Sequence, residues 1–148
     1  MAETLGMLCD KLTIVKLKQY HSDDPGKLKS LFEQATALQN EIDQYFADGI
    51  SGKIPVEKLS FAANKVYHPA GNEIREFVGG IGDFISQLAD INCQLWHEQE
   101  KVYEFEKVPV DEKNAVVKNL AVLNLERNKC IDLINQAFQE IVTKKIKA

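Results

Sequence analysis

Apolar residues recur in steps of three and four along most of this chain, and helix-breaking residues are confined to a few short stretches. This spacing is typical of amphipathic α-helices, whereas a half-buried strand would alternate apolar and polar residues. No segment of useful length alternates in that way. The 4 prolines and 8 glycines separate the periodic segments, so we predict an all-α protein. The breaks are Pro25-Gly26, Gly49 to Pro55, Pro69 to Gly71, Gly79 to Gly82, and Pro109.

These breaks divide the chain into about four long helices. Asp24 before Pro25 predicts a helix start, because an aspartate caps the first N–H groups and proline fits the first helical position. Gly49 is typical of a helix end, and Asp111 of a further cap. At 148 residues the chain can bury one core, so we expect a single helical-bundle domain over residues 1–148. The predicted helices are Glu3–Tyr20, Pro25–Ala47, one from near Asp83 and one from Asp111 to Lys144, with short pieces at Val56–Val66 and Asn72–Phe77.

The apolar positions predict how these helices pack. The first helix has one stripe from Leu5 through Leu12 to Val15, while Ile14 and Leu17 lie on a different face. A helix that is apolar on two faces is usually covered on both. The predicted seam of the last helix is Val117, Leu120, Ile131, Ile134, Phe138 and Ile141.

Composition excludes several classes of function. The net charge of −4 provides no overall field for nucleic acid or an anionic membrane. The 3 cysteines and 3 histidines are widely spaced and lack C-x-x-C or H-x-x-x-H, so we predict free thiols, no disulfide framework and no metal site. No phosphate-loop or dinucleotide motif is present, so no cofactor is predicted. Without a signal-like segment or a run of roughly 18 apolar residues, a cytoplasmic protein with no membrane span is expected.

Polar residues interrupt the apolar seams at a few positions. In the last helix the steps run Leu120, Asn124, Arg127, Ile131, and in the preceding long helix Asn92 lies between Leu88 and Leu95. Asp10 shares a face of the first helix with Ile14 and Leu17. Burying a charge costs several kcal/mol unless it is paired, so Asp10 and Arg127 are expected to pair. The full candidate set is Asp10, Lys11, Asn92, Asn124 and Arg127.

Two interpretations of this set stay open. The first is a structural polar layer that determines how the helices pair. The second is a binding site in the bundle core for an anionic small molecule. Trp96 beside the seam is either a packing anchor or a stacking platform. Glu100 shares a helix side with Glu104, and such a pair could bind magnesium, but no matching carboxylate motif occurs on a second helix.

Three short motifs carry a resemblance to known proteins. They are Asp10-Lys11-Leu12-Thr13-Ile14, Asn92-x-x-Leu95-Trp96 followed by Glu98 and Glu100, and Asn124-x-x-Arg127 before Ile134-Asn135. In this order they resemble small all-helical bacterial families of unknown function. The resemblance covers about the first third and the last two fifths of the chain, and Met7 departs from it where those families often carry an acidic residue. It implies a helical fold and, because such genes often lie near glycosyltransferase and lipopolysaccharide genes, an accessory role in surface-glycan synthesis.

Two functions are therefore compared. One is a non-enzymatic helical binding or scaffold protein, as a homodimer or with a protein partner. The alternative is a small helical enzyme acting on a phosphorylated or nucleotide-linked small molecule. In that enzyme Arg127 and Lys11 would hold the anion, and Glu100 or Asp10 would act as base or metal ligand. A sealed Asp10–Arg127 pair favours the scaffold, whereas an open cleft that Glu100 faces favours the enzyme.

Overall fold

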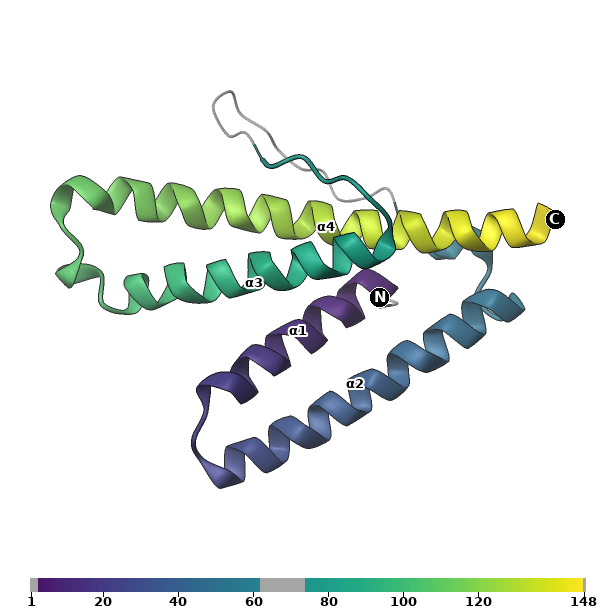
Figure 1. The fold of residues 1–148 in the computed structure, drawn as a ribbon, viewed down its shortest axis with the longest axis horizontal. Coiled ribbons are helices and arrows are strands. Elements are labelled where there is room, and N and C mark those ends of the chain that lie inside the picture. Colours follow the sequence, from purple (N-terminus) through teal and green to yellow (C-terminus); the bar gives the residue numbers. More distant parts are fainter. Residues whose placement is uncertain (1–2, 62–73, 148) are drawn as a thin grey trace.

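The protein folds into two helical hairpins (Figure 1). The computed structural model describes residues 3–61 and 74–147, and within these ranges it contains helices and no strand, which confirms the predicted all-α class. Helices α1 (Leu5–His21) and α2 (Pro25–Ser51) form the first hairpin. Helices α3 (Ile81–Tyr103) and α4 (Lys113–Lys147) form the second. Three short 3₁₀ helices lie between them, at Val56–Lys58, Phe105–Lys107 and Val110–Glu112.

Helix α1 joins the two hairpins. It lies between α2 and the α3–α4 pair in Figure 1, and it contacts all three helices. Its first turns enter the main core through Leu5 and Leu8, while Val15 packs against Leu31 and Ala35 of α2. Helix α1 is therefore covered by different helices along its length, while Ile14 and Leu17 of its second predicted apolar face are half-buried.

The helix starts follow local chemistry. The Thr4 side chain accepts a hydrogen bond from the Met7 N–H, and Asp24 accepts from the N–H groups of Gly26 and Lys27. The predicted start at Asp24 is thus confirmed. Helix α3 starts two residues before Asp83, whose carboxylate accepts from the Gly80 N–H at 2.8 Å.

Gly49 does not end α2, contrary to the sequence prediction. The helix continues to Ser51, and Gly52, with φ at +84°, takes the left-handed conformation that ends it. Gly49 is buried, and a Cβ added there would lie 2.7 Å from Cε2 of Phe138 on α4. Gly49 therefore allows α2 and the Phe138 ring of α4 to approach closely, and it does not form a turn.

Other local predictions were also wrong. The expected helix Val56–Val66 is a 3₁₀ turn at Val56–Lys58, followed by irregular backbone to residue 61; its remainder lies outside the described residues. For the expected helix Asn72–Phe77, the described residues 74–77 are not helical. Asp111 lies inside a 3₁₀ helix instead of capping α4.

The apolar seam of α4 is displaced from its predicted positions. Val117 and Ile141 are exposed, whereas their neighbours Val116 and Val142 are buried. A straight helix has 3.6 residues per turn, so a strict seven-residue pattern drifts by about 20° per heptad. Over the 35 residues of α4 this drift moves the ends of the seam by one residue. No helix in the described ranges is long and apolar enough to cross a membrane.

Candidate functional site

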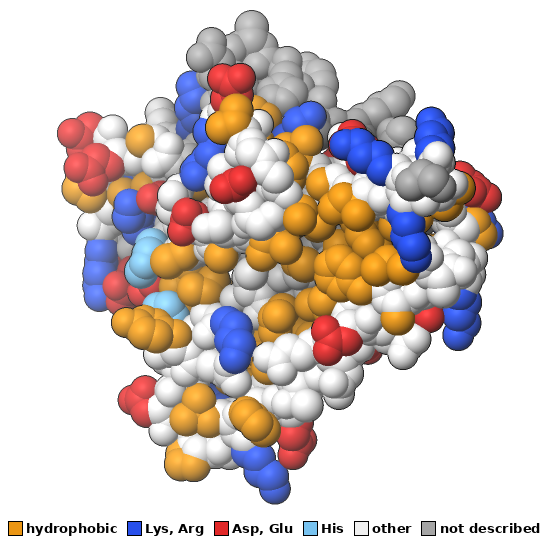
Figure 2. All heavy atoms as spheres, turned by 45° about the vertical axis from the view of Figure 1, so that its right-hand side comes forward, with side chains coloured by type: hydrophobic (Ala, Val, Ile, Leu, Met, Phe, Trp, Pro, Cys, Tyr) orange, Lys and Arg blue, Asp and Glu red, His pale blue; other side chains and the backbone are white. Residues whose placement is uncertain are grey.

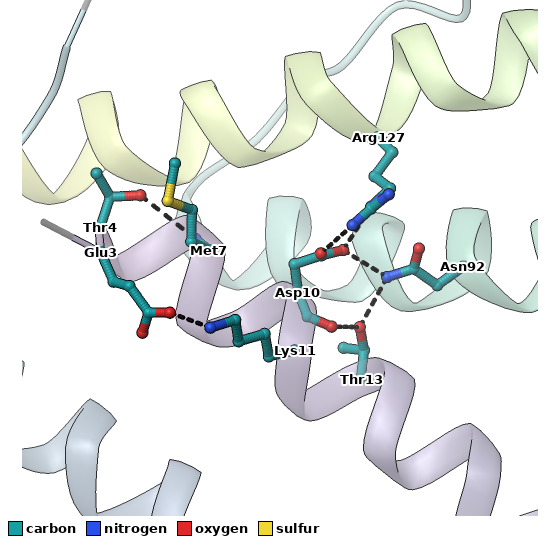
Figure 3. A network of polar contacts seen from close by, with 8 residues as sticks. All are labelled: Glu3, Thr4, Met7, Asp10, Lys11, Thr13, Asn92 and Arg127. Atoms are coloured by element: carbon teal, nitrogen blue, oxygen red, sulfur yellow. Dashed lines mark hydrogen bonds and ion pairs between the residues drawn. The ribbon is translucent and has the colours of Figure 1, made fainter. Parts of the chain in front are cut away.

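The strongest polar contact between the hairpins joins Asp10 of α1 to Arg127 of α4 (Figure 3). The Arg127 Nε donates to Oδ1 of Asp10 at 2.9 Å, and its Nη2 donates to Oδ2 at 2.5 Å. Both carboxylate oxygens are therefore engaged by one planar guanidinium. Asp10 is only 4% exposed, and the Arg127 side chain is 32% exposed. The pairing expected from the sequence is present.

Asn92 extends this contact to α3. Its Nδ2 donates to Oδ1 of Asp10 at 2.9 Å and to the Thr13 hydroxyl at 2.8 Å. The Thr13 hydroxyl in turn donates to the Asp10 carbonyl oxygen at 2.8 Å. These four residues, Asp10, Thr13, Asn92 and Arg127, form what we call the polar layer. It connects α1, α3 and α4, and no buried side-chain nitrogen or oxygen of these four residues lacks a hydrogen-bond partner.

The electrostatics of the layer favour the charged pair. The hydrogen bond to Asp10 is the main cause that raises the pKa of Arg127 above its usual value, and it outweighs the opposing effect of partial burial. A guanidinium is already charged at any working pH, so its charge is a permanent feature of the layer. Burying Asp10 is tolerated because this charge and the Asn92 amide lie beside it.

A close approach of the α1 and α4 backbones determines which residues of the two helices lie opposite each other in the polar layer. A Cβ on Gly6 would lie 2.4 Å from the carbonyl oxygen of Ile131, so only glycine fits there without a shift. The Gly6 N–H donates to Oδ1 of buried Asn135 at 2.7 Å. Four residues further along α1 is Asp10, and four residues back along α4 from Ile131 is Arg127. The glycine contact therefore aligns the carboxylate with the guanidinium.

Two predicted members do not belong to the layer. The Lys11 ammonium lies on the exposed surface and pairs with Glu3, and the hydrogen bond to Glu3 is the main cause that raises its pKa. Asn124 is exposed, and its Nδ2 donates to the Leu120 carbonyl oxygen of its own helix at 3.1 Å. The three-four stepping placed Asn124 in the seam, but its neighbour Leu123 takes the buried position in the structure.

The secondary candidates lie on another part of α3. Trp96 is half-buried, and its ring stacks on His21 with centroids 4.6 Å apart and planes 20° apart. Glu100 is exposed, with Oε1 3.3 Å from Nδ1 of His97, while Glu104 pairs with Lys107. In the described ranges no three His, Cys, Asp or Glu side chains gather closely enough to hold a metal ion.

The sequence did not predict a second buried ion pair, between Glu126 and Arg75. Glu126 is 4% exposed, and its Oε2 accepts from the Arg75 N–H at 2.8 Å and from its Nε at 2.7 Å. Arg75 Nη2 also donates to Oε1 of Gln94 at 2.9 Å. The one available signal was the spacing of Glu126 between Leu123 and Cys130, which fits a seam displaced by one residue. Arg75 lies in irregular backbone, where periodicity predicts nothing.

The Arg75–Glu126 pair borders a cavity of about 720 Å³ between α3 and α4. Lys118, Asn119 and His97 also line it. Glu98 lines it too, but one of its carboxylate oxygens is buried without a hydrogen-bond partner in the described residues. The lining thus mixes both signs of charge and selects no single class of ligand.

Comparison of the chain with protein-family models, with curated proteins and with solved structures found no match.

Proposed function

We propose that this protein is a non-enzymatic helical binding or scaffold protein in which the polar layer is structural. The observation that carries the proposal is the closure of the Asp10–Arg127 contact. Both oxygens of Asp10 accept hydrogen bonds from Arg127, and Asn92 supplies a further donor. A carboxylate so engaged and only 4% exposed is not free to act as a base or a metal ligand.

The positions of the other candidates support the same proposal. The alternative enzyme needs Lys11, Arg127 and Glu100 around one substrate. Lys11 instead pairs with Glu3 at the surface and points away from Arg127 in Figure 3. Glu100 pairs with His97 on the exposed side of α3. Neither Asp10 nor Arg127 lines the cavity beside Arg75 and Glu126.

Exposed apolar side chains support a binding role. Figure 2 shows a broad apolar area on one face of the molecule. Ile50 near the end of α2 is 46% exposed, and Ile141 and Ile146 of α4 are 51% and 65% exposed. Lys145 donates to the Ile50 carbonyl oxygen at 3.3 Å, so the ends of α2 and α4 lie together. Apolar surface of this kind is typical of proteins that bind a partner or a second copy of themselves.

The setting of this role is proposed from the resemblance of the motifs. We place the protein in the bacterial cytoplasm, as an accessory to surface-glycan synthesis. Asp10, Asn92 and Arg127 all belong to the motifs that carry the resemblance, and all three contribute to the polar layer. A structural role for the layer accounts for these motif positions without any catalytic step.

Genetic complementation tests the proposal. Deletion of the gene should alter the surface-glycan pattern on gels, and the Asp10→Leu/Arg127→Met double variant should restore it as wild type does. The expected result follows because an apolar replacement of a buried pair can keep the helices packed. Protein level, checked by immunoblot, shows whether each variant is folded and present. A double variant that is present at the wild-type level but does not restore the phenotype contradicts a purely structural layer.

A turnover assay addresses the enzyme directly. Purified protein is incubated with nucleotide sugars and sugar phosphates, with and without Mg²⁺, and followed by ³¹P NMR. No new phosphorus signal is expected. Turnover that disappears in Asp10→Asn, a variant of nearly the same shape, would establish the enzyme in place of the scaffold.

A further inference from the structure

A small pocket lies where the end of α1 and the start of α2 meet α3. Its volume is about 400 Å³, within the range of pockets that hold small molecules. Leu31 contributes an apolar side chain to its lining, and Gln34 contributes an amide. No carboxylate is among the lining residues, although the chain as a whole is acidic. The remaining lining residues are Lys18, His21, Ser22, Lys27, Ser30 and Trp96.

The two lysines give this pocket its charge. Lys18 is in the last turn of α1 and Lys27 is in the first turn of α2, and both are exposed. Neither forms an ion pair with any residue in the described ranges. The carboxylates between the two lysines in the chain are Asp23 and Asp24. Asp24 is already engaged by the N–H groups of Gly26 and Lys27, and Asp23 forms no ion pair with either lysine. Both ammonium groups are therefore available to an anion.

The His21–Trp96 stack forms one wall of the pocket. The His21 Nδ1 lies 2.8 Å from the Leu17 carbonyl oxygen. A carbonyl oxygen only accepts, so Nδ1 carries a proton and Nε2 is the ring nitrogen left for another group. The neighbouring His97 ring has its centroid 6.3 Å from that of His21, and the histidine side chains lie close together in Figure 2. The wall thus combines an aromatic surface with a polar nitrogen.

We propose that this pocket binds the phosphate group of a small phosphorylated molecule. Lys18 and Lys27 supply charge-assisted hydrogen bonds to the phosphate oxygens, and the hydroxyls of Ser22 and Ser30 supply further donors. The organic part of the ligand packs beside Trp96. The inference goes beyond the scaffold role and does not rest on it, because none of these residues belongs to the polar layer.

Trp96 makes the site directly observable. It is the single tryptophan of the chain, so an ¹H–¹⁵N NMR spectrum contains one indole N–H signal. The probes are ribose 5-phosphate and inorganic phosphate, with uncharged ribose at the same concentration and ionic strength. We expect both phosphate probes to shift the indole signal with saturation, and ribose to leave it in place.

Matched lysine variants locate the site. Lys18→Gln and Lys27→Gln should each weaken the apparent affinity for ribose 5-phosphate about tenfold, equivalent to about 1.4 kcal/mol. Lys16→Gln and Lys29→Gln remove the same charge from the same helices outside the pocket lining, so they should leave the affinity within about twofold. All four positions are exposed, and unchanged thermal unfolding confirms that each variant is folded.

Three outcomes would overturn the proposal. One is an indole signal that no phosphate probe shifts. Another is a shift of equal size with uncharged ribose, which would show that charge does not determine binding. The third is equal weakening by all four lysine variants, which would indicate attraction by general charge rather than a site. None of these outcomes bears on the complementation result, so failure of the pocket and failure of the scaffold role are distinguishable.

Discussion

Replacing Arg127 by methionine tests whether the polar layer stabilises the fold. The substitution leaves the Asp10 carboxylate, whose side chain is 6% exposed, with Asn92 as its remaining side-chain donor. Removing one partner of a buried ion pair costs about 3–5 kcal/mol. Because the Arg127 side chain is 32% exposed, water can enter part of the space it leaves. We therefore expect the lower end, about 3 kcal/mol of unfolding free energy.

The double-mutant cycle separates pairing from packing. Asp10→Leu alone should cost about 1–3 kcal/mol, because the guanidinium loses its partner but is near solvent. The Asp10→Leu/Arg127→Met variant should be more stable than the sum of the two single losses predicts, by about 2 kcal/mol. No uncompensated charge then remains in the core.

Urea unfolding followed by circular dichroism measures each free energy, and the slope with urea shows whether the unfolding stays comparable between variants. Asn124→Ala on the same helix is the matched control. Its side chain is exposed, so the change should stay within about 0.5 kcal/mol. If Arg127→Met costs no more than the control, or if the two single losses simply add in the double variant, the reasoning from a buried pair is refuted.

Two further predictions concern glycine packing and buried thiols. Gly49→Ala should destabilise the protein by about 1–3 kcal/mol because the new Cβ would meet the Phe138 ring at 2.7 Å, whereas Gly82→Ala, with nothing within 4 Å, should be neutral or slightly stabilising in thermal unfolding. Burial raises the pKa of the Cys9 and Cys130 thiols from 9.0 to about 11. The unfolded thiols lose their protons first, so stability should fall as pH rises from about 9 to about 11, by roughly 2–3 kcal/mol per thiol. Urea unfolding at pH 8 and pH 10.5 should show this loss in wild type and a smaller one in Cys9→Ala/Cys130→Ala; equal losses would contradict the assignment.

The polar layer shows how far sequence reasoning reaches in this protein. Asp10, Asn92 and Arg127 were identifiable because each interrupts an apolar stripe, and a buried charge requires a partner. That argument needs only the helical repeat and the cost of burying a charge. The stepping misplaced Asn124, because its neighbour Leu123 takes the buried position. No stripe argument placed Lys11, which was included because it follows Asp10 in the same motif. Predicting the burial of Glu126 required knowing which face of α4 is packed in the structure. Its partner Arg75 lies in irregular backbone, where the sequence has no periodic pattern.

The sequence by itself determined the all-α class, the four long helices and the start of α2, because caps such as Asp24 and the spacing of apolar residues act within a few residues. Tertiary structure alone decided which residues meet across the two hairpins. In the sequence, Gly6 and Gly49 cannot be distinguished from a glycine in a turn. Each is required because a residue of α4, more than eighty positions away in the chain, lies where its Cβ would be. Such contacts depend on the relative placement of whole helices. That placement results from the packing of all side chains together and from no local pattern.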